Sequence, residues 1–91
     1  MPTEHIARVV VRNERGLHLH VASLLAREAA VFSSEVFLKR GDVTANAKSV
    51  MSLALLAAPC GTELDLSATG QDAEEAVRRL SARFAAKFDA P

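Results

Sequence analysis

Hydrophobic residues recur along this chain with two spacings, and each spacing predicts a different kind of secondary structure. Runs in which apolar residues are β-branched or alternate with polar ones are typical of strands. Such runs predict strands at residues 5–12, 35–39, 43–47 and 62–68. Apolar residues three and four positions apart predict helices over residues 19–32, from 50 to about 57, and over 73–88.

Capping residues support these boundaries. Ser49 precedes the second helix and is expected to cap it, because a serine hydroxyl accepts a hydrogen bond from an N–H group of the first turn. Asp72, followed three residues later by Glu75, resembles a capping box at the start of the third helix. The order β-α-β-β-α-β-α predicts one α+β domain over residues 1–91, in which three amphipathic helices cover one face of a sheet of about four strands.

Composition narrows the classes of function. The chain has 91 residues, with 11 Lys or Arg and 11 Asp or Glu, so it has no overall positive field for binding nucleic acid. No apolar run is long enough to span a membrane, and the N-terminus lacks the pattern of a signal peptide. Cys60 is the only cysteine, which excludes an internal disulfide or a Cys-x-x-Cys site. These observations predict a cytoplasmic protein with no nucleic-acid partner and no membrane insertion. We also expect a monomer that needs no cofactor and no metal.

Candidate chemistry centres on His18, which lies between a glycine turn and the first turn of the predicted first helix. The first N–H groups of a helix have no partner within the helix and carry partial positive charge, so they bind anions such as phosphate. The backbone N–H groups of Leu19 and His20 would have this role here. From these residues alone, His18 is either a nucleophile beside a phosphate-binding helix end or a partly exposed histidine with no function.

Three short stretches match motifs of one known family. Residues 16–22, Gly-Leu-His-Leu-His-Val-Ala, are similar to G-[LI]-H-A-R-P-A, and residues 48–53, Lys-Ser-Val-Met-Ser-Leu, are similar to K-S-[IV]-M-[GS]-[LV]. Residues 61–70 are similar to a G-x-E-[IVL] strand followed by A-x-G. Over essentially its full length the chain therefore resembles HPr, the small histidine-containing phosphocarrier of the bacterial phosphoenolpyruvate-dependent phosphotransferase system.

The resemblance implies a fold and a function. The fold is an open-faced sandwich, with a four-stranded antiparallel sheet covered on one face by three helices. His18 would accept a phosphoryl group on Nδ1 from phosphorylated enzyme I and pass it to an enzyme IIA-type protein, as a stoichiometric carrier rather than a turnover enzyme. An apolar docking surface is expected at Leu19, Met51, Leu53 and Leu55, although Met51 and Leu53 could equally belong to the core.

Two residues of the first motif depart from the family pattern. His20 replaces an arginine and Val21 replaces a proline. Arginine presents a permanent charge and a planar fork of donors to phosphate, so its loss is expected to weaken phosphate binding by ~1–2 kcal/mol without removing the nucleophile. His20 could stabilise the phosphate as imidazolium, act as a second phosphoacceptor, pair with His18 at a metal, or have no role. Arg15 could supply the missing charge, but a solvated turn residue is the simpler interpretation.

The sequence also leaves open whether the protein has a regulatory role, beginning with Ser49. In many relatives the serine that matches Ser49 is phosphorylated by HPr kinase/phosphorylase, and in others it only caps the helix. For this chain capping is expected, and phosphorylation of Ser49 is left open. The replacements at His20 and Val21 also support a second hypothesis for function, an HPr-like regulatory module that binds protein partners and has lost efficient phosphotransfer.

Overall fold

A computed structural model describes residues 3–91. Its four strands form one sheet in the order β1-β4-β2-β3, and all neighbouring strands are antiparallel. The strands are β1 (Glu4–Val10), β2 (Glu35–Arg40), β3 (Val43–Asn46) and β4 (Glu63–Thr69). The predicted four-stranded antiparallel sheet is therefore confirmed, with strand ends shifted by one or two residues.

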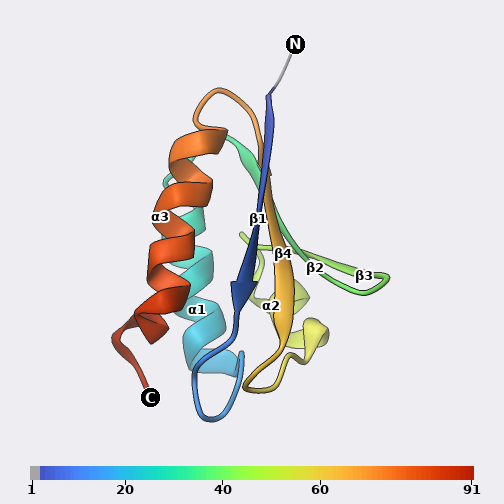
Figure 1. Cartoon of the computed structure of the whole chain (residues 1–91), viewed down its shortest axis with the longest axis vertical. Coiled ribbons are helices and arrows are strands. Elements are labelled where there is room, and N and C mark those ends of the chain that lie inside the picture. Colours follow the sequence, from blue (N-terminus) through green and yellow to red (C-terminus); the bar gives the residue numbers. More distant parts are fainter. Residues whose placement is uncertain (1–2) are drawn as a thin grey trace.

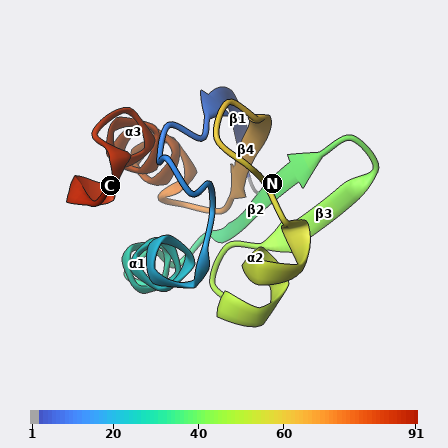
Figure 2. The same ribbon diagram turned by 90° about the horizontal axis from the view of Figure 1, so that it is seen from below.

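Three helices cover one face of this sheet (Figure 1, Figure 2). They are α1 (Leu19–Ala29), α2 (Val50–Leu56) and α3 (Ala73–Ala85), and a single 3-10 turn, η1 (Lys87–Asp89), follows α3. α3 packs across β1 and β4, and α2 packs against β3 and α1. The predicted open-faced sandwich is confirmed. Among the described residues, no helix is long and apolar enough to cross a membrane.

The core lies between the sheet and the helices, and each element buries side chains with its own spacing. Leu64, Leu66 and Ala68 are buried along β4, and the residues between them are more exposed. α1 and α3 each contribute a stripe of buried residues three and four positions apart. These are Val21, Ala22, Leu25, Ala26 and Ala29 in α1, and Ala73, Ala76, Val77, Leu80 and Phe84 in α3.

In α1 and α3, the helix ends before the last apolar residue of its predicted stripe. α1 ends at Ala29, and Phe32 is buried in the following turn, where the Arg79 guanidinium lies 5.6 Å from the centre of its ring. Phe88 reaches the core from η1, in which residues 87–89 have positive φ, and its ring meets Phe84 edge to face with centroids 5.0 Å apart. The predicted helix ends at residues 32 and 88 are therefore wrong. Phe32 and Phe88 fit the helical spacing, but a side chain can also be buried from the turn that follows a helix.

Asp72 precedes α3 but does not cap it, so the predicted capping box is wrong. Its carboxylate instead accepts hydrogen bonds from the Ser33 N–H at 2.8 Å, the Ser34 N–H at 2.9 Å and the Ser34 hydroxyl. These bonds, that of the Ser34 hydroxyl above all, lower the pKa of Asp72 to about 2. Glu75, the other member of the expected box, pairs with Arg78. Asp72 therefore ties the turn after α1 to the start of α3.

Replacing Asp72 with asparagine is expected to reduce the loss of stability in acid. The folded carboxylate has a pKa of about 2, below its usual value of 3.8, so its stabilisation is fully present above about pH 4 and is lost as the pH falls through about 2. Urea unfolding of the wild type and Asp72→Asn at about pH 5 and about pH 2.5 measures the difference. Asp42→Asn, in the exposed β2–β3 turn, is the matched control. An equal fall in the wild type and Asp72→Asn would contradict this assignment.

Candidate functional site

The backbone that leads into α1 is held against the loop that follows α2. The Leu17 N–H donates to the Ala58 carbonyl at 2.8 Å. Gly16 has a φ of +74°, and a Cβ there would overlap the Ala58 carbonyl oxygen and lie 2.7 Å from the Pro59 Cα. Only glycine permits this approach, because it has no Cβ and readily adopts positive φ. The contact thereby positions His18 at the start of α1.

Asn13 anchors the other end of this turn, and the sequence patterns described above did not single it out. Its side chain is buried, and Nδ2 donates to the carbonyl oxygens of Lys87 at 2.9 Å and Ala90 at 3.0 Å. Its own carbonyl accepts the Gly16 N–H at 2.8 Å, which closes the turn. Its side-chain partners lie 74 and 77 positions away in the chain, so no local pattern could have identified them.

His18 occupies the N-cap position of α1 with a partly exposed side chain. Its backbone is extended (φ −77°, ψ 175°), its carbonyl accepts the Ala22 N–H at 2.8 Å, and its imidazole makes no capping bond to the helix. Leu19 and His20 follow in the first turn, where N–H groups have no partner within an α-helix. The structure therefore brings together an imidazole and the open end of a helix, as the sequence predicts.

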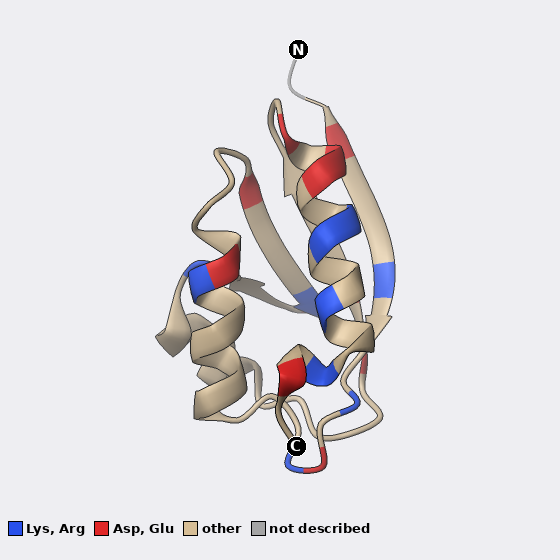
Figure 3. Ribbon diagram, turned by 90° about the vertical axis from the view of Figure 1, so that its left-hand side faces the viewer, with Lys and Arg blue, Asp and Glu red and all other residues tan. Residues whose placement is uncertain are grey.

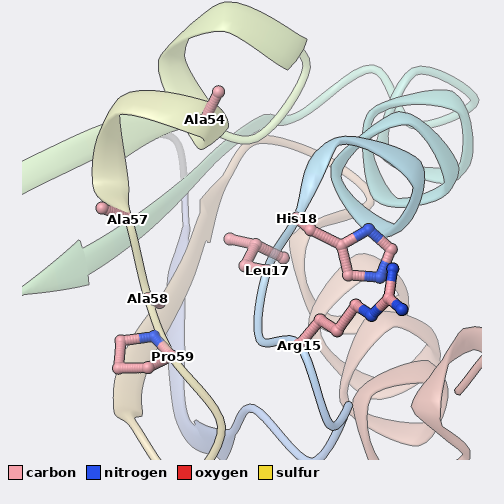
Figure 4. Close-up of a pocket in the computed structure, with 7 residues that line it drawn as sticks. All are labelled: Arg15, Leu17, His18, Ala54, Ala57, Ala58 and Pro59. Carbon is pink, nitrogen blue, oxygen red and sulfur yellow. The ribbon is translucent and has the colours of Figure 1, made fainter.

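Two hollows meet at His18, and Arg15 lines both of them as well. The first, of about 360 Å³, lies between the start of α1 and the loop after α2 (Figure 4). The second, of about 340 Å³, lies beside the turn that precedes α1. The other lining residues are Leu17, Ala54, Ala57, Ala58 and Pro59 in the first hollow, and Glu14 and Pro91 in the second. A partner can therefore reach His18 from outside the molecule.

His20 lies beside His18 but lines neither hollow. The two rings are nearly parallel, with 16° between their planes and 6.2 Å between their centroids. The side chain of His20 is exposed. Within residues 3–91, no three His, Cys, Asp or Glu side chains are grouped as metal ligands. The geometry therefore gives no support to a metal site at this pair.

The family of the chain follows from comparison with known proteins. A family model described as the HPr component phosphorylation site of the phosphotransferase system matches residues 6–86. The chain belongs to the HPr family. The match runs from β1 to the end of α3 and so includes His18, the helix that follows it and Ser49.

Relatives that are named HPr agree with this assignment. The phosphocarrier protein HPr of Treponema pallidum (strain Nichols) is 36% identical over 84 residues, which cover 92% of this chain and 96% of the relative. The crystal structure of an HPr from Thermoanaerobacter tengcongensis has a TM-score of 0.90 at 32% identity, over 96% of this chain and 98% of that one. The fold and the family are therefore shared over nearly the whole chain.

A further relative is the HPr-like protein Crh of Bacillus subtilis (strain 168), which is 44% identical over 75 residues, covering 82% of this chain and 88% of the relative. Its crystal structure has a TM-score of 0.74 at 42% identity and covers 87% of this chain and 91% of that one. That Crh structure is described as an intertwined dimer with a swapped domain. For this HPr-family protein, the monomer expected from the sequence stays a prediction.

The docking surface predicted for this HPr-family protein is wrong at one residue. Leu53 is fully buried because it faces the core from α2, so it cannot contact a partner. Met51 and Leu55 lie on the outer face of the same helix and are 73% and 79% exposed, and Leu19 at the start of α1 is 65% exposed. Ala54 of α2 lines the first hollow, so this outer face borders the site. The role of the three exposed side chains in docking stays a prediction.

Ser49 caps α2, as the sequence predicts. Its hydroxyl oxygen accepts the Ser52 N–H at 3.2 Å, and the Ser52 hydroxyl in turn accepts the Asn46 N–H at 2.9 Å. The neighbouring Lys48 donates from Nζ to the Phe32 carbonyl at 2.7 Å, which holds its charge at the turn after α1. Capping is therefore confirmed, and phosphorylation of Ser49 stays a prediction.

Proposed function

We propose that this protein carries a phosphoryl group on Nδ1 of His18, accepts it from phosphorylated enzyme I, and passes it to an enzyme IIA-type protein in the cytoplasm. The observation that supports this most directly is the partly exposed imidazole at the open N-terminal end of α1, within the segment that matches the HPr phosphorylation-site family. The hollows beside His18 are open, which suits exchange of a group between two proteins better than turnover of a small enclosed substrate.

The transfer itself needs only the imidazole and donors for the phosphoryl oxygens. The Nδ1 lone pair of His18 forms the new P–N bond, and the bond from phosphorus to the donor breaks with its electron pair staying on the donor. Negative charge on the phosphoryl oxygens then lies beside the N–H groups of Leu19 and His20 at the positive end of α1. The second transfer runs the same exchange in reverse, with His18 as the leaving group. The protein is a stoichiometric carrier in this scheme.

Docking in this proposal uses the exposed apolar side chains that border the site. Leu19, Met51 and Leu55 lie on the elements that flank the first hollow, and large exposed apolar residues grouped near a site are typical of protein-binding surfaces. Enzyme I and the enzyme IIA-type acceptor would bind this surface in turn, because each must bring its own reacting atom to His18.

A second candidate function is a regulatory module that binds partners without efficient phosphotransfer. The 44% identity to Crh, whose structure is described as that of a catabolite repression protein, favours it. His20 supports it too, since this residue does not line the hollows beside His18. Phosphorylation of Ser49 by an HPr kinase/phosphorylase would belong to this regulatory function.

Phosphoryl transfer from phosphoenolpyruvate through the cognate enzyme I, followed by intact mass, tests the proposal. We expect one acid-labile phosphate on the wild type, none on His18→Ala, and one on each of the controls His20→Ala and His5→Ala. A phosphate that persists in His18→Ala and is lost in His20→Ala would make His20 the acceptor. A wild type that stays unlabelled under conditions that label an ordinary HPr would overturn the carrier function and favour the regulatory module.

A further inference from the structure

A phosphoryl group on His18 would carry close to two negative charges, and the backbone N–H groups nearby supply only partial positive charge. Hydrogen bonds from a cationic side chain to phosphate oxygens are roughly twice as strong as those from neutral donors. We propose that the guanidinium of Arg15 binds the phosphoryl oxygens at His18. This inference rests on the phosphocarrier function proposed above and names the charged ligand of that same site.

The position of Arg15 is the first argument. Arg15 and His18 are the two residues that line both hollows, and Figure 4 shows the side chain of Arg15 extended toward the imidazole of His18. Arg15 lies in the turn that Gly16 holds against the loop after α2, so its backbone is anchored beside the site. A guanidinium presents a planar fork of donors that matches two oxygens of one phosphoryl group.

The second argument is that Arg15 has no carboxylate or carbonyl partner among the described residues, whereas five other basic side chains have one. Figure 3 shows Lys and Arg interspersed with Asp and Glu along α3 and in the adjacent loops. Within residues 3–91, Arg15 makes no ion pair and donates no side-chain hydrogen bond, in contrast to the basic side chains that contact carboxylates or carbonyl oxygens: Arg8, Arg40, Lys48, Arg78 and Arg83. Its five donors are therefore free for a ligand.

The remaining basic residues border neither hollow beside His18. Within the described chain, the other Lys and Arg side chains without a carboxylate or carbonyl partner line neither hollow: Arg12, Arg27, Lys39, Arg79 and Lys87. His20 lines neither hollow as well, and an imidazole offers fewer donors than a guanidinium and is charged only when protonated. Arg15 is thus the cation that the fold brings to His18.

The acidic groups indicate on which side the phosphoryl group would lie. Glu14 lines the second hollow, where its carboxylate would repel a phosphoryl dianion. The first hollow has no acidic residue among those that line it, and Arg15 and His18 both border it. We therefore expect the phosphoryl oxygens to occupy the first hollow, beside the guanidinium of Arg15 and next to His18 at the start of α1.

A titration with inorganic phosphate tests the role of Arg15 without enzyme I. The backbone amide signals of Leu19 and His20 are followed by NMR as sodium phosphate is added, with sodium chloride at equal ionic strength as the reference. We expect a saturable shift in the wild type, about 10-fold weaker binding in Arg15→Gln, and wild-type binding in Arg12→Gln, which loses the same charge from a nearby exposed position. Equal binding by the wild type and Arg15→Gln, or a wild-type response no larger than that to chloride, would overturn the inference.

Phosphoryl transfer from enzyme I then separates this inference from the function on which it rests. We expect kcat/KM for transfer to fall roughly 10-fold or more in Arg15→Gln and to stay unchanged in Arg12→Gln. Equal transfer to the wild type and Arg15→Gln would overturn the role of Arg15 and leave the carrier function intact. If phosphate binding depends on Arg15 but enzyme I transfers nothing to the wild type, the anion-binding role of Arg15 is supported and only the carrier function is overturned.

Discussion

Gly16→Ala is expected to lower the free energy of unfolding by ~2–4 kcal/mol and to slow phosphoryl transfer to His18. The new Cβ would overlap the Ala58 carbonyl oxygen and lie 2.7 Å from the Pro59 Cα, and both are backbone atoms that cannot rotate away. The variant must also hold a φ of +74°, which costs a residue with a side chain about 1–2 kcal/mol. A loss of this size is a large share of the ~5–15 kcal/mol that stabilises a typical domain.

Gly41→Ala isolates the effect of the close approach. Gly41 has a similar φ of +59°, but a Cβ there would meet nothing within 4 Å, so its replacement is expected to cost only about 1–2 kcal/mol, the cost of the positive φ. Urea unfolding of both variants measures the difference, and transfer from enzyme I is compared at a temperature at which both are folded. Equal destabilisation by the two substitutions would show that the packing of Gly16 on the loop after α2 does not limit stability.

Leu53→Ala is the second substitution with a large expected effect. The Leu53 side chain is fully buried, so its truncation is expected to cost ~2–5 kcal/mol through lost burial and the cavity that remains. Leu55→Ala, two positions along the same helix, removes the same atoms from a side chain that is 79% exposed, and we expect a change within about 0.5 kcal/mol. Thermal or urea unfolding of the pair gives the comparison directly.

Leu55→Ala also tests the docking surface. Because Leu55 is exposed beside the site, Leu55→Ala is expected to raise KM for transfer from enzyme I several-fold, by about the ~1 kcal/mol of one apolar contact, with the fold unchanged. Thr44→Ala, in the exposed strand β3, is the control for a surface change away from the site. A wild-type KM for Leu55→Ala would remove this residue from the proposed docking surface.

Local patterns predicted most of the fold because they reflect local physics. Alternation over residues 62–68 predicted β4, in which Leu64 and Leu66 are buried, and the change of spacing at Leu19 marked the first residue of α1. Ser49 was recognised as a cap because a capping bond joins residues only three positions apart. Each of these features depends on residues that lie only a few positions apart in the chain.

Predictions failed where a distant residue decides what a side chain does. Asp72 has the sequence context of a helix cap, but Ser33 and Ser34 offer it three donors once α1 and α3 are packed together. Leu53 belongs to a helix of only seven residues, which is too short for spacing alone to separate its buried face from its exposed one. Long-range packing decides which donors Asp72 meets. It also decides which face of α2 is buried.

By itself, the sequence determined the order of the elements, the position of His18 at the start of a helix and the likeness to HPr, because spacing, capping and motifs are properties of short segments. Only the tertiary structure decided which side chains meet His18. Residues 15–18 and 57–59 are far apart in the chain and are joined by the Gly16 contact and by the Leu17 hydrogen bond to Ala58. The contact between these two segments creates the hollow that Arg15 and His18 both line. No local pattern in the sequence encodes that contact.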